Sequence, residues 1–357
     1  MLYLIHARTE EARRRYCLHR PEEKPMRAIV IEEPGGPDVM KVGEVPEPLL
    51  GAGELLVAVR AAGVNRADLL QRMGRYPPPP GESGTLGLEV AGEVIAVAPD
   101  AAGRGPLGQT FRVGDRVMAL LAGGGYAERV RVPAAQALPI PPQLSMAEAA
   151  AIPEAFLTAW LNLMTLGQLA QGDVAVIHAA ASGVGTAALQ LCRGVASQVV
   201  ATASNGKLAS LAQYGATQLV DRNDVPTTLS KSIRATLGKG ADVILDLVGA
   251  SYLAANIEAL ALHGRLVCIA TQGGAKAELD LAALLFRRLT VIGSTLRSRT
   301  AEQKAALCAE FAERALPRFS RGELQPVLAR TFPLAEASAA HALLARNAVV
   351  GKIVLEL

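Results

Sequence analysis

Apolar residues between positions 174 and 293 fall into short continuous runs that are separated by stretches of helical periodicity. Such runs are typical of strands buried on both faces of a sheet. Because helical segments lie between consecutive runs, the pattern predicts a doubly wound parallel sheet with crossover helices. The predicted strands are residues 174–177, 198–202, 218–221, 243–246, 265–269 and 290–293.

The pattern from residue 26 to residue 132 is different, because its apolar stretches are broken by glycine and proline. Many short strands with such turns indicate a closed or partly closed β unit. The predicted strands of this unit are residues 27–31, 55–61, 93–97, 116–121 and 126–132.

Helix signals join and follow these two regions. Two capping boxes, Ser145 with Glu148 and Thr300 with Gln303, mark helix starts. Residues 156–160 predict a buried helix that leads into the parallel sheet. The alternation ends after Gly293, and we expect the tail (strand 327–332, helix 334–344, strand 352–355) to return to the β unit.

Four parts of the chain are therefore predicted: an extension at 1–25, a β domain at 26–150, a nucleotide-binding domain at 151–295 and a return segment at 296–357. Residues 1–25 are charged and lack the apolar core of a signal peptide. We expect them to be a disordered extension, which could arise if the gene's start was assigned too early. An N-terminal docking helix is the alternative.

Composition excludes several functional classes. The 36 Lys and Arg residues against 33 Asp and Glu residues give a net charge of +3. This small excess does not indicate the basic surface that a nucleic-acid-binding protein needs. No uninterrupted apolar run is long enough to span a bilayer, so no membrane partner is expected. The four cysteines, Cys17, Cys192, Cys268 and Cys308, form no C-x-x-C pair, which favours a reducing, cytoplasmic location and no structural zinc.

A turn of small residues follows the first parallel strand. Helical periodicity begins at Val184, so the N–H groups and dipole of a helix start would face this turn and suit a pyrophosphate. Laid on G-x-G-x-x-G, the positions hold Ala180, Ser182 and Gly185, so only the last glycine fits. The motif alone leaves open a turn without a nucleotide, and the strand–helix units after it favour a dinucleotide.

The end of the second parallel strand, where a dinucleotide ribose would lie, indicates which cofactor is bound. An acidic residue there would indicate NAD, but the chain offers Ser204 and Lys207. A hydroxyl and a cation suit a 2′-phosphate, so the sequence predicts NADPH.

With these residues in place, the chain resembles the medium-chain dehydrogenase/reductase superfamily, in its zinc-free quinone oxidoreductase branch. It is similar there to the tumour-suppressor-inducible NADPH:quinone oxidoreductase type, whose turn also carries SGVGTAA. The resemblance covers residues 26–357. The motifs that carry it are GEVP, GVNRAD, GRYPPPPG, LGLEVAGEV, VGDRVMAL, GGYAERV, IHAAASGVGTAALQL, GADVILDLVG, STLRSR and GKIVLEL.

The resemblance implies an α/β fold with a GroES-like β-barrel catalytic domain and a Rossmann doubly wound parallel-sheet domain. It also implies no catalytic zinc. Asn65 stands where zinc-dependent relatives have a ligand cysteine, and Leu88-Glu89 stands where they have His-Glu. Without thiolate or imidazole ligands a tetrahedral zinc site cannot form, so a zinc alcohol dehydrogenase is excluded.

The family's motifs also imply site residues in this chain. Tyr76 and Asn65 would line the nicotinamide side of the cleft, with Thr158 below it. Arg222 stands where many relatives carry a tyrosine, so it is either a second cation for the 2′-phosphate or an exposed arginine. The remaining implied residues are Ser182, Gly183, Val184 and Gly185 for the pyrophosphate, Ser204 and Lys207 for the 2′-phosphate, and Ala270, Thr271, Gln272, Leu296, Arg297 and Ser298 beside nicotinamide and substrate.

Each of these hypotheses has a structural alternative. Tyr76 is either a cleft residue or a loop aromatic packed on the prolines, and Glu89 is either functional or only a packing or salt-bridge residue. His178 is interpreted as a core histidine. Arg66, Arg72 and Arg75 form either a basic cleft rim or an exposed helix face.

The expected function is NADPH-dependent reduction of a quinone or another α,β-unsaturated carbonyl compound. The alternatives are an enoyl-thioester reductase and an NADPH-binding regulatory protein without turnover. The edge strand 290–293 favours a homodimer joined through the cofactor domains.

Overall fold

The computed structural model describes residues 24–357. The expectation of an N-terminal extension lies outside the described residues, apart from Lys24 and Pro25. Pro25 is the first residue of β1 (Pro25–Val30), which pairs antiparallel with β2 (Lys41–Pro46).

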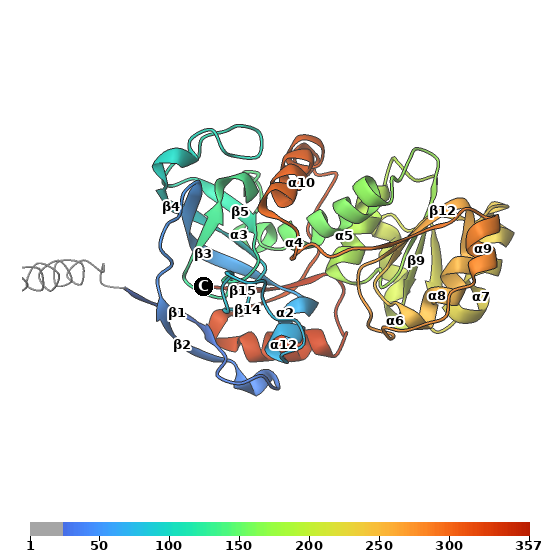
Figure 1. Ribbon diagram of the computed structural model, residues 1–357, viewed down its shortest axis with the longest axis horizontal. Helices are drawn as coiled ribbons and strands as arrows, with labels where there is room; N and C mark the ends of the chain where they lie inside the picture. The colour runs from blue at the N-terminus through green and yellow to red at the C-terminus, as the bar shows by residue number, and fades with distance from the viewer. Residues whose placement is uncertain (1–23) are drawn as a thin grey trace, which may run out of the picture.

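The first large sheet belongs to the catalytic domain and has the strand order β14-β15-β3-β4-β5-β7, with β6 paired to β3. Its strands come from both ends of the chain, because β15 pairs antiparallel with β3. Figure 1 shows this return, with the red C-terminal strands against the blue β3. The strands are β3 (Glu54–Val64), β4 (Glu89–Val97), β5 (Arg116–Leu120), β6 (Arg129–Pro133), β7 (Ala137–Pro139), β14 (Leu328–Pro333) and β15 (Lys352–Glu356).

The second sheet has six parallel strands in the order β10-β9-β8-β11-β12-β13, as the apolar runs predicted. The strands are β8 (Val174–Ile177), β9 (Gln198–Ala203), β10 (Gln218–Asp221), β11 (Ala241–Asp246), β12 (Leu260–Cys268) and β13 (Thr290–Gly293). The accompanying helices are α5 (Gly183–Cys192), α6 (Asn205–Leu208), α7 (Val225–Leu237), α8 (Ala250–Ala259) and α9 (Leu281–Phe286). A GroES-like domain with a Rossmann domain is thus the fold, as expected from the resemblance.

Helices α4, α5 and α10 lie between the two sheets (Figure 1). Their buried side chains, among them Phe156, Leu189 and Phe311, form one core cluster together with Met118 of β5. The two sheets are therefore joined by a shared apolar core. The helices outside the parallel-sheet domain are α2 (Arg66–Arg72), α3 (Met146–Ala149), α4 (Pro153–Trp160), α10 (Ala301–Arg314), α11 (Leu316–Ser320) and α12 (Ala337–Ala345).

Both predicted capping boxes are present. The Oγ of Ser145 accepts from Glu148 N at the start of α3, and the hydroxyl of Thr300 accepts from Gln303 N at the start of α10. Each satisfies backbone donors that a helix start leaves free. A third box, which sequence analysis missed, pairs Asn65 with Asp68 at the start of α2.

One helical stretch, Met146–Leu166, is long and apolar enough to cross a membrane by length and composition alone. Of its most apolar window, 72% is buried inside the protein. The stretch includes α4 and supplies Phe156 and Trp160 to the shared core, so it is a core helix.

Candidate cofactor and active site

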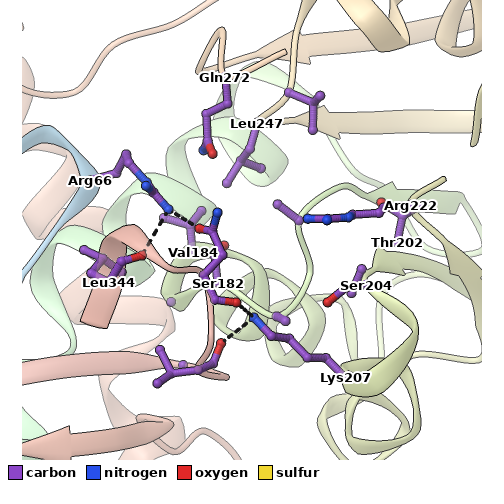
Figure 2. A pocket seen from close by; sticks show the side chains of 18 of the residues that line it. Arg66, Ser182, Val184, Thr202, Ser204, Lys207, Arg222, Leu247, Gln272 and Leu344 are labelled. Carbon is purple, nitrogen blue, oxygen red and sulfur yellow. Dashed lines mark hydrogen bonds between the residues drawn. The ribbon is translucent and has the colours of Figure 1, made fainter. Parts of the chain in front are cut away.

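A cavity of about 400 Å³ lies at the carboxyl ends of β8 and β9. Its opposite wall comes from the catalytic domain, from the start of α2 and the turn that precedes β15 (Figure 2). Parallel strands commonly present ligand sites at this edge. The predicted site residues that line the cavity are Asn65, Ser182, Gly183, Val184, Ser204, Lys207, Arg222 and Gln272.

The predicted pyrophosphate turn leads into α5. Ser182 is its N-cap, and its Oγ accepts from Gly185 N at 3.0 Å. A Cβ on Gly185 would lie 2.5 Å from Ala180 Cα, so only glycine fits there. Ala179 has a φ of 49°, a left-handed conformation that is uncommon outside glycine. The first-turn N–H groups at Gly183 and Val184 have no partner within the helix, which suits an anion in the cavity.

Two cations share the other end of the cavity. Lys207 and Arg222 both line it, near Ser204, the N-cap of α6 (Figure 2). Burial lowers the pKa of Lys207, and the positive charge of Arg222 lowers it further. In the structure Lys207 Nζ donates to the carbonyl oxygens of Asn347 and Val349, the latter at 2.9 Å. Two cations that repel each other beside a cavity favour an anion between them.

Arg66 and Lys352 also line the cavity: Arg66 was one of the three arginines of the proposed basic cleft rim, whereas Lys352 was not predicted from the sequence. The guanidinium of Arg66 donates to Asn347 Oδ1 and, at 3.5 Å, to Leu344 O. Of the other two arginines of the proposed basic rim, Arg72 is buried against Gly35 O and His341, while Arg75 is exposed. The cavity therefore has cations on both of its walls.

Lys352 forms a buried ion pair with Glu89, with 2.6 Å between Nζ and Oε1. Lys352 Nζ also donates to Asn65 Oδ1 at 2.5 Å and to Val64 O at 3.0 Å. Asn65 Nδ2 donates to Glu89 Oε1 at 2.8 Å. The predicted nicotinamide-side Asn65 is therefore held in place by the pair, which is the salt-bridge role that the sequence left open for Glu89. The positive charge of Lys352 Nζ at this position would also repel a metal ion.

A second carboxyl group, Glu154, lies beside this pair. The N–H of Glu154 donates to Glu89 Oε2 at 2.8 Å. Its own Oε2 is buried and has no hydrogen-bond partner among residues 24–357. Burial, together with the charge of Glu89, raises the pKa of Glu154 to about 8. Glu154 therefore holds a proton at neutral pH.

A further buried network supports the start of α2. Asp68 accepts from Asn65 N at 2.7 Å, from Gly87 N at 3.2 Å and from the Tyr126 hydroxyl at 3.2 Å. Burial raises the pKa of Asp68 to about 6. The Tyr126 hydroxyl also bonds to His341. Burial, and to a lesser degree the charge of Arg72, lowers the pKa of His341 to about 3, so this histidine is neutral. The network fixes the backbone of Asn65.

Tyr76 does not line the cavity. The guanidinium carbon of Arg297 lies 5.3 Å from the centre of its ring. Arg297 also donates to Ala122 O at 2.8 Å and to Gln71 Oε1 at 2.7 Å. Burial raises the pKa of Tyr76, so its phenol keeps its proton at neutral pH. Arg297 thus joins the segment after β13 to the loop of Tyr76.

The other predicted residues lie outside the cavity lining. Thr158 is buried in α4, Leu296 is buried, and Ser298 bonds through its hydroxyl to Thr295. In the loop after β12 the cavity is lined by Gln272 and its neighbour Gly273, and not by Ala270 or Thr271. The roles of these residues stay predictions.

His178 is a core histidine, as interpreted from the sequence. It is fully buried, Nδ1 lies 2.9 Å from Thr202 Oγ1 and Nε2 lies 2.7 Å from Asn256 Oδ1. Within residues 24–357, no group of three or more His, Cys, Asp or Glu side chains could hold a metal ion.

Two family models match the chain. Residues 51–142 match the alcohol dehydrogenase GroES-like domain, and residues 183–312 match the zinc-binding dehydrogenase model. At the positions where the resemblance implies zinc ligands, this chain has Asn65 and Leu88-Glu89.

Curated relatives and solved structures agree with these matches. The mouse synaptic vesicle membrane protein VAT-1 homolog is 37% identical over 68% of this chain and 58% of its own length, so the chain spans about three fifths of this relative. The quinone oxidoreductase of Lama guanicoe is 30% identical over 93% of this chain and 98% of its own.

Two solved structures show a similar fold. Mycobacterial Rv1454c complexed with NADPH has a TM-score of 0.81 and 29% identity, covering 93% of this chain and all of its own. CurK enoyl reductase has a TM-score of 0.80 and 26% identity, covering 93% of this chain and 99% of its own.

Proposed function

The chain belongs to the medium-chain dehydrogenase/reductase superfamily of oxidoreductases, and on that premise we propose that it is a zinc-independent NADPH:quinone oxidoreductase. Its acceptors would be quinones or similar α,β-unsaturated carbonyl compounds. One observation carries the choice of NADPH: Lys207 and Arg222 line the same end of the cavity as Ser204. The complex of a 29% identical mycobacterial relative with NADPH supports it.

The residues of the cavity fit a nicotinamide dinucleotide. The first turn of α5 would hold the pyrophosphate, where Gly185 leaves room for close approach, and Arg66 lies across the cavity from that turn. Lys207 and Arg222 would hold the 2′-phosphate by charge-assisted hydrogen bonds. Bound there, the cofactor supplies a hydride, and the chain orients it and excludes water.

The catalytic-domain wall would orient the acceptor. Asn65 is fixed by the Lys352–Glu89 pair, and its amide can hydrogen-bond a nicotinamide or carbonyl group that enters the cavity. Tyr76 lies outside the lining of this cavity, so its protonated phenol would donate only to an acceptor that extends beyond it. A reduced quinone oxygen is a mild base that takes protons from solvent, so the reaction needs no strong acid from the protein.

Two other functions compete with this proposal. An enoyl-thioester reductase is favoured by the likeness to CurK enoyl reductase, and its enolate intermediate would need a placed acid. A binding protein without turnover would keep the cavity and bind NADPH tightly. An NADPH-oxidation screen of ortho-quinones, para-quinones and a trans-2-enoyl thioester separates the three. No turnover on any acceptor would favour the binding protein.

Tyr76→Phe is expected to reduce quinone turnover less than about tenfold, because general acid catalysis, typically worth 10²–10⁴-fold, matters little for a quinone. The measurement is kcat with each acceptor class in wild type and variant. Tyr214→Phe, which removes a phenol from the helical turn after α6, is the matched control. Strong enoyl turnover that collapses in Tyr76→Phe, with weak quinone activity, would establish the enoyl reductase instead.

We also propose a homodimer joined through the cofactor domains. β13 is an edge strand, and the neighbouring α9 exposes Leu285 and Phe286 by 72% and 84%. Light scattering at micromolar concentration should give about twice the chain mass of 37.2 kDa. Phe286→Glu should yield monomers because it places a charge in the contact, whereas Leu107→Glu, on an exposed loop of the catalytic domain, should not. A monomer mass for the wild type would refute the proposal.

A further inference from the structure

A second depression, of about 780 Å³, lies on the catalytic domain and shares no lining residue with the cofactor cavity. We call it the outer groove. It is bordered by residues 80–83 of the loop that carries Tyr76, by the turn at 121–124 after β5, and by the start of α10 with Lys304. Its size is that of a site for a drug-sized ligand.

Two cations of the outer groove have no partner. Lys304 is only 5% exposed, and no hydrogen bond or ion pair joins its Nζ to any residue from Lys24 to Leu357. The Nε of Arg299 is buried and likewise lacks a partner among the described residues. The other two cations of the groove are neutralised: Arg129 pairs with Glu47 at 2.8 Å and Arg131 pairs with Glu54 at 3.9 Å.

A largely buried cation without an ion-pair partner is unfavourable in a folded protein, so an anion bound beside it would be stabilising. Burial lowers the pKa of Lys304, and the charge of Glu82 opposes this effect although the two side chains form no ion pair. The carboxylate of Glu82 is on an exposed loop, and Glu154 holds a proton at neutral pH. No carboxylate among the described residues therefore forms an ion pair with this ammonium group, which lines the open groove together with Glu82.

The outer groove reaches the neighbourhood of the proposed reaction. Ala122 lines the groove and accepts a hydrogen bond from Arg297, whose guanidinium lies over the Tyr76 ring. The rise in the pKa of Glu154 is opposed by the charge of Lys352, which lines the cofactor cavity, and by the charge of Lys304, which lines the groove. Arg297 thus connects the outer groove to the loop that carries Tyr76.

We propose that the outer groove binds an anionic group of the substrate, with Lys304 as its counter-ion and Arg299 as a second donor. This inference rests on the proposed reductase function and adds the substrate class: an unsaturated carbonyl compound that carries a carboxylate or a phosphate on its tail. The two sources of negative charge are a carboxylate on the acyl group and a phosphate on a thioester carrier.

The test compares three acceptors with the same reacting bond. They are the neutral N-acetylcysteamine thioester of trans-2-butenoate, the coenzyme A thioester of the same acid, and the N-acetylcysteamine monothioester of trans-2-pentenedioate. We expect kcat/KM for one of the two anionic acceptors to exceed that for the neutral one by roughly tenfold or more. Preference for the coenzyme A ester identifies phosphate as the source, and preference for the monothioester identifies carboxylate.

Lys304→Met should bring this ratio close to one, since it removes the counter-ion but keeps the length of the side chain. Arg129→Met, which removes a groove cation that is already paired with Glu47, should keep the ratio. Equal kcat/KM for all three acceptors in the wild type would overturn the proposal. An equal loss of the ratio in both variants would also overturn it, because that loss would reflect only the overall positive charge of the groove.

Calorimetry separates failure of this inference from failure of the proposed function. The protein is saturated with NADP⁺, so that the cofactor cavity is filled, and is titrated with 4′-phosphopantetheine, pantetheine and glutarate. Binding of phosphopantetheine or glutarate that Lys304→Met weakens about tenfold supports the groove even if no acceptor is reduced. No binding of either anion, or equal binding of pantetheine and phosphopantetheine with none of glutarate, overturns it.

Discussion

Lys352→Met is expected to destabilise the folded protein by about 3–5 kcal/mol, the largest effect that we predict for one side chain. The substitution leaves Glu89, which is fully buried, without the cation 2.6 Å from its carboxylate. It also removes the donor to Asn65 Oδ1 and Val64 O. The measurement is the free energy of unfolding from a denaturant titration without cofactor, read from the shift of the midpoint at constant slope.

The control for Lys352→Met is the double variant Lys352→Met/Glu89→Gln. A glutamine keeps one carbonyl oxygen, so it can still accept from either Asn65 Nδ2 or Glu154 N, which donate to different oxygens of Glu89, and it carries no charge to bury. The double variant should therefore recover a large part of the lost stability, since the penalty comes mainly from the uncompensated charge. If single and double variants lose the same free energy, the ion pair is not the cause.

Lys207→Ala should lower the preference for NADPH over NADH, which we expect to be roughly tenfold to a hundredfold in the wild type. A charge-assisted contact with a phosphate dianion contributes on the order of 1–3 kcal/mol to binding. NADH has no 2′-phosphate, so its binding does not include this contact. The measurement is the ratio of kcat/KM for the two cofactors with one acceptor. Arg222, on the same cavity, would account for the preference that remains.

A structural role for Lys207 would give a different result. Its Nζ already donates to Asn347 O and Val349 O, so the alanine variant also loosens the turn before β15. An equal loss with both cofactors would show that this turn, and not the 2′-phosphate, depends on the lysine. Lys231→Ala, an exposed lysine of α7, is the matched control and should leave the ratio unchanged.

The parallel sheet was the most predictable part of the fold. The runs at Val174–Ile177, Gln218–Asp221 and Thr290–Gly293 are strands with the predicted bounds. Of these, only Val174–Ile177 is buried at every residue, as a central strand covered on both faces should be. β12 begins at Leu260 instead of 265, where its pairing with β11 is irregular near Ala241. A strand with a shifted register has no uninterrupted apolar run to reveal it.

The strands that sequence analysis missed leave weaker signals. β2 (Lys41–Pro46) pairs only with β1, and none of its side chains is fully buried. β7 (Ala137–Pro139) is three residues long. A short strand or an exposed strand needs few apolar positions, so neither periodicity nor continuity marks it.

Site residues could be predicted where the residues that form the site are close together in the sequence. Ser182, Gly183 and Lys207 were predicted because strand, turn and helix are consecutive there, and all three line the cavity. Lys352 was missed because its partner Asn65 lies 287 residues away, and no local pattern signals such a contact. Tyr76 and Arg297 were assigned by resemblance alone, and the structure places them together beside the outer groove.

The pairing of β15 with β3 also sets a schedule for synthesis. Val64 of β3 pairs with Ile353, so 289 residues must be translated before that edge of β3 is covered. At roughly 5–20 residues per second, a ribosome needs roughly 15–60 s for this interval. The parallel sheet is complete once β13 has emerged, whereas the nascent β3 keeps an open edge that can pair with other chains. Chaperone dependence during translation should therefore concentrate on the catalytic domain, although its first strands are made earliest.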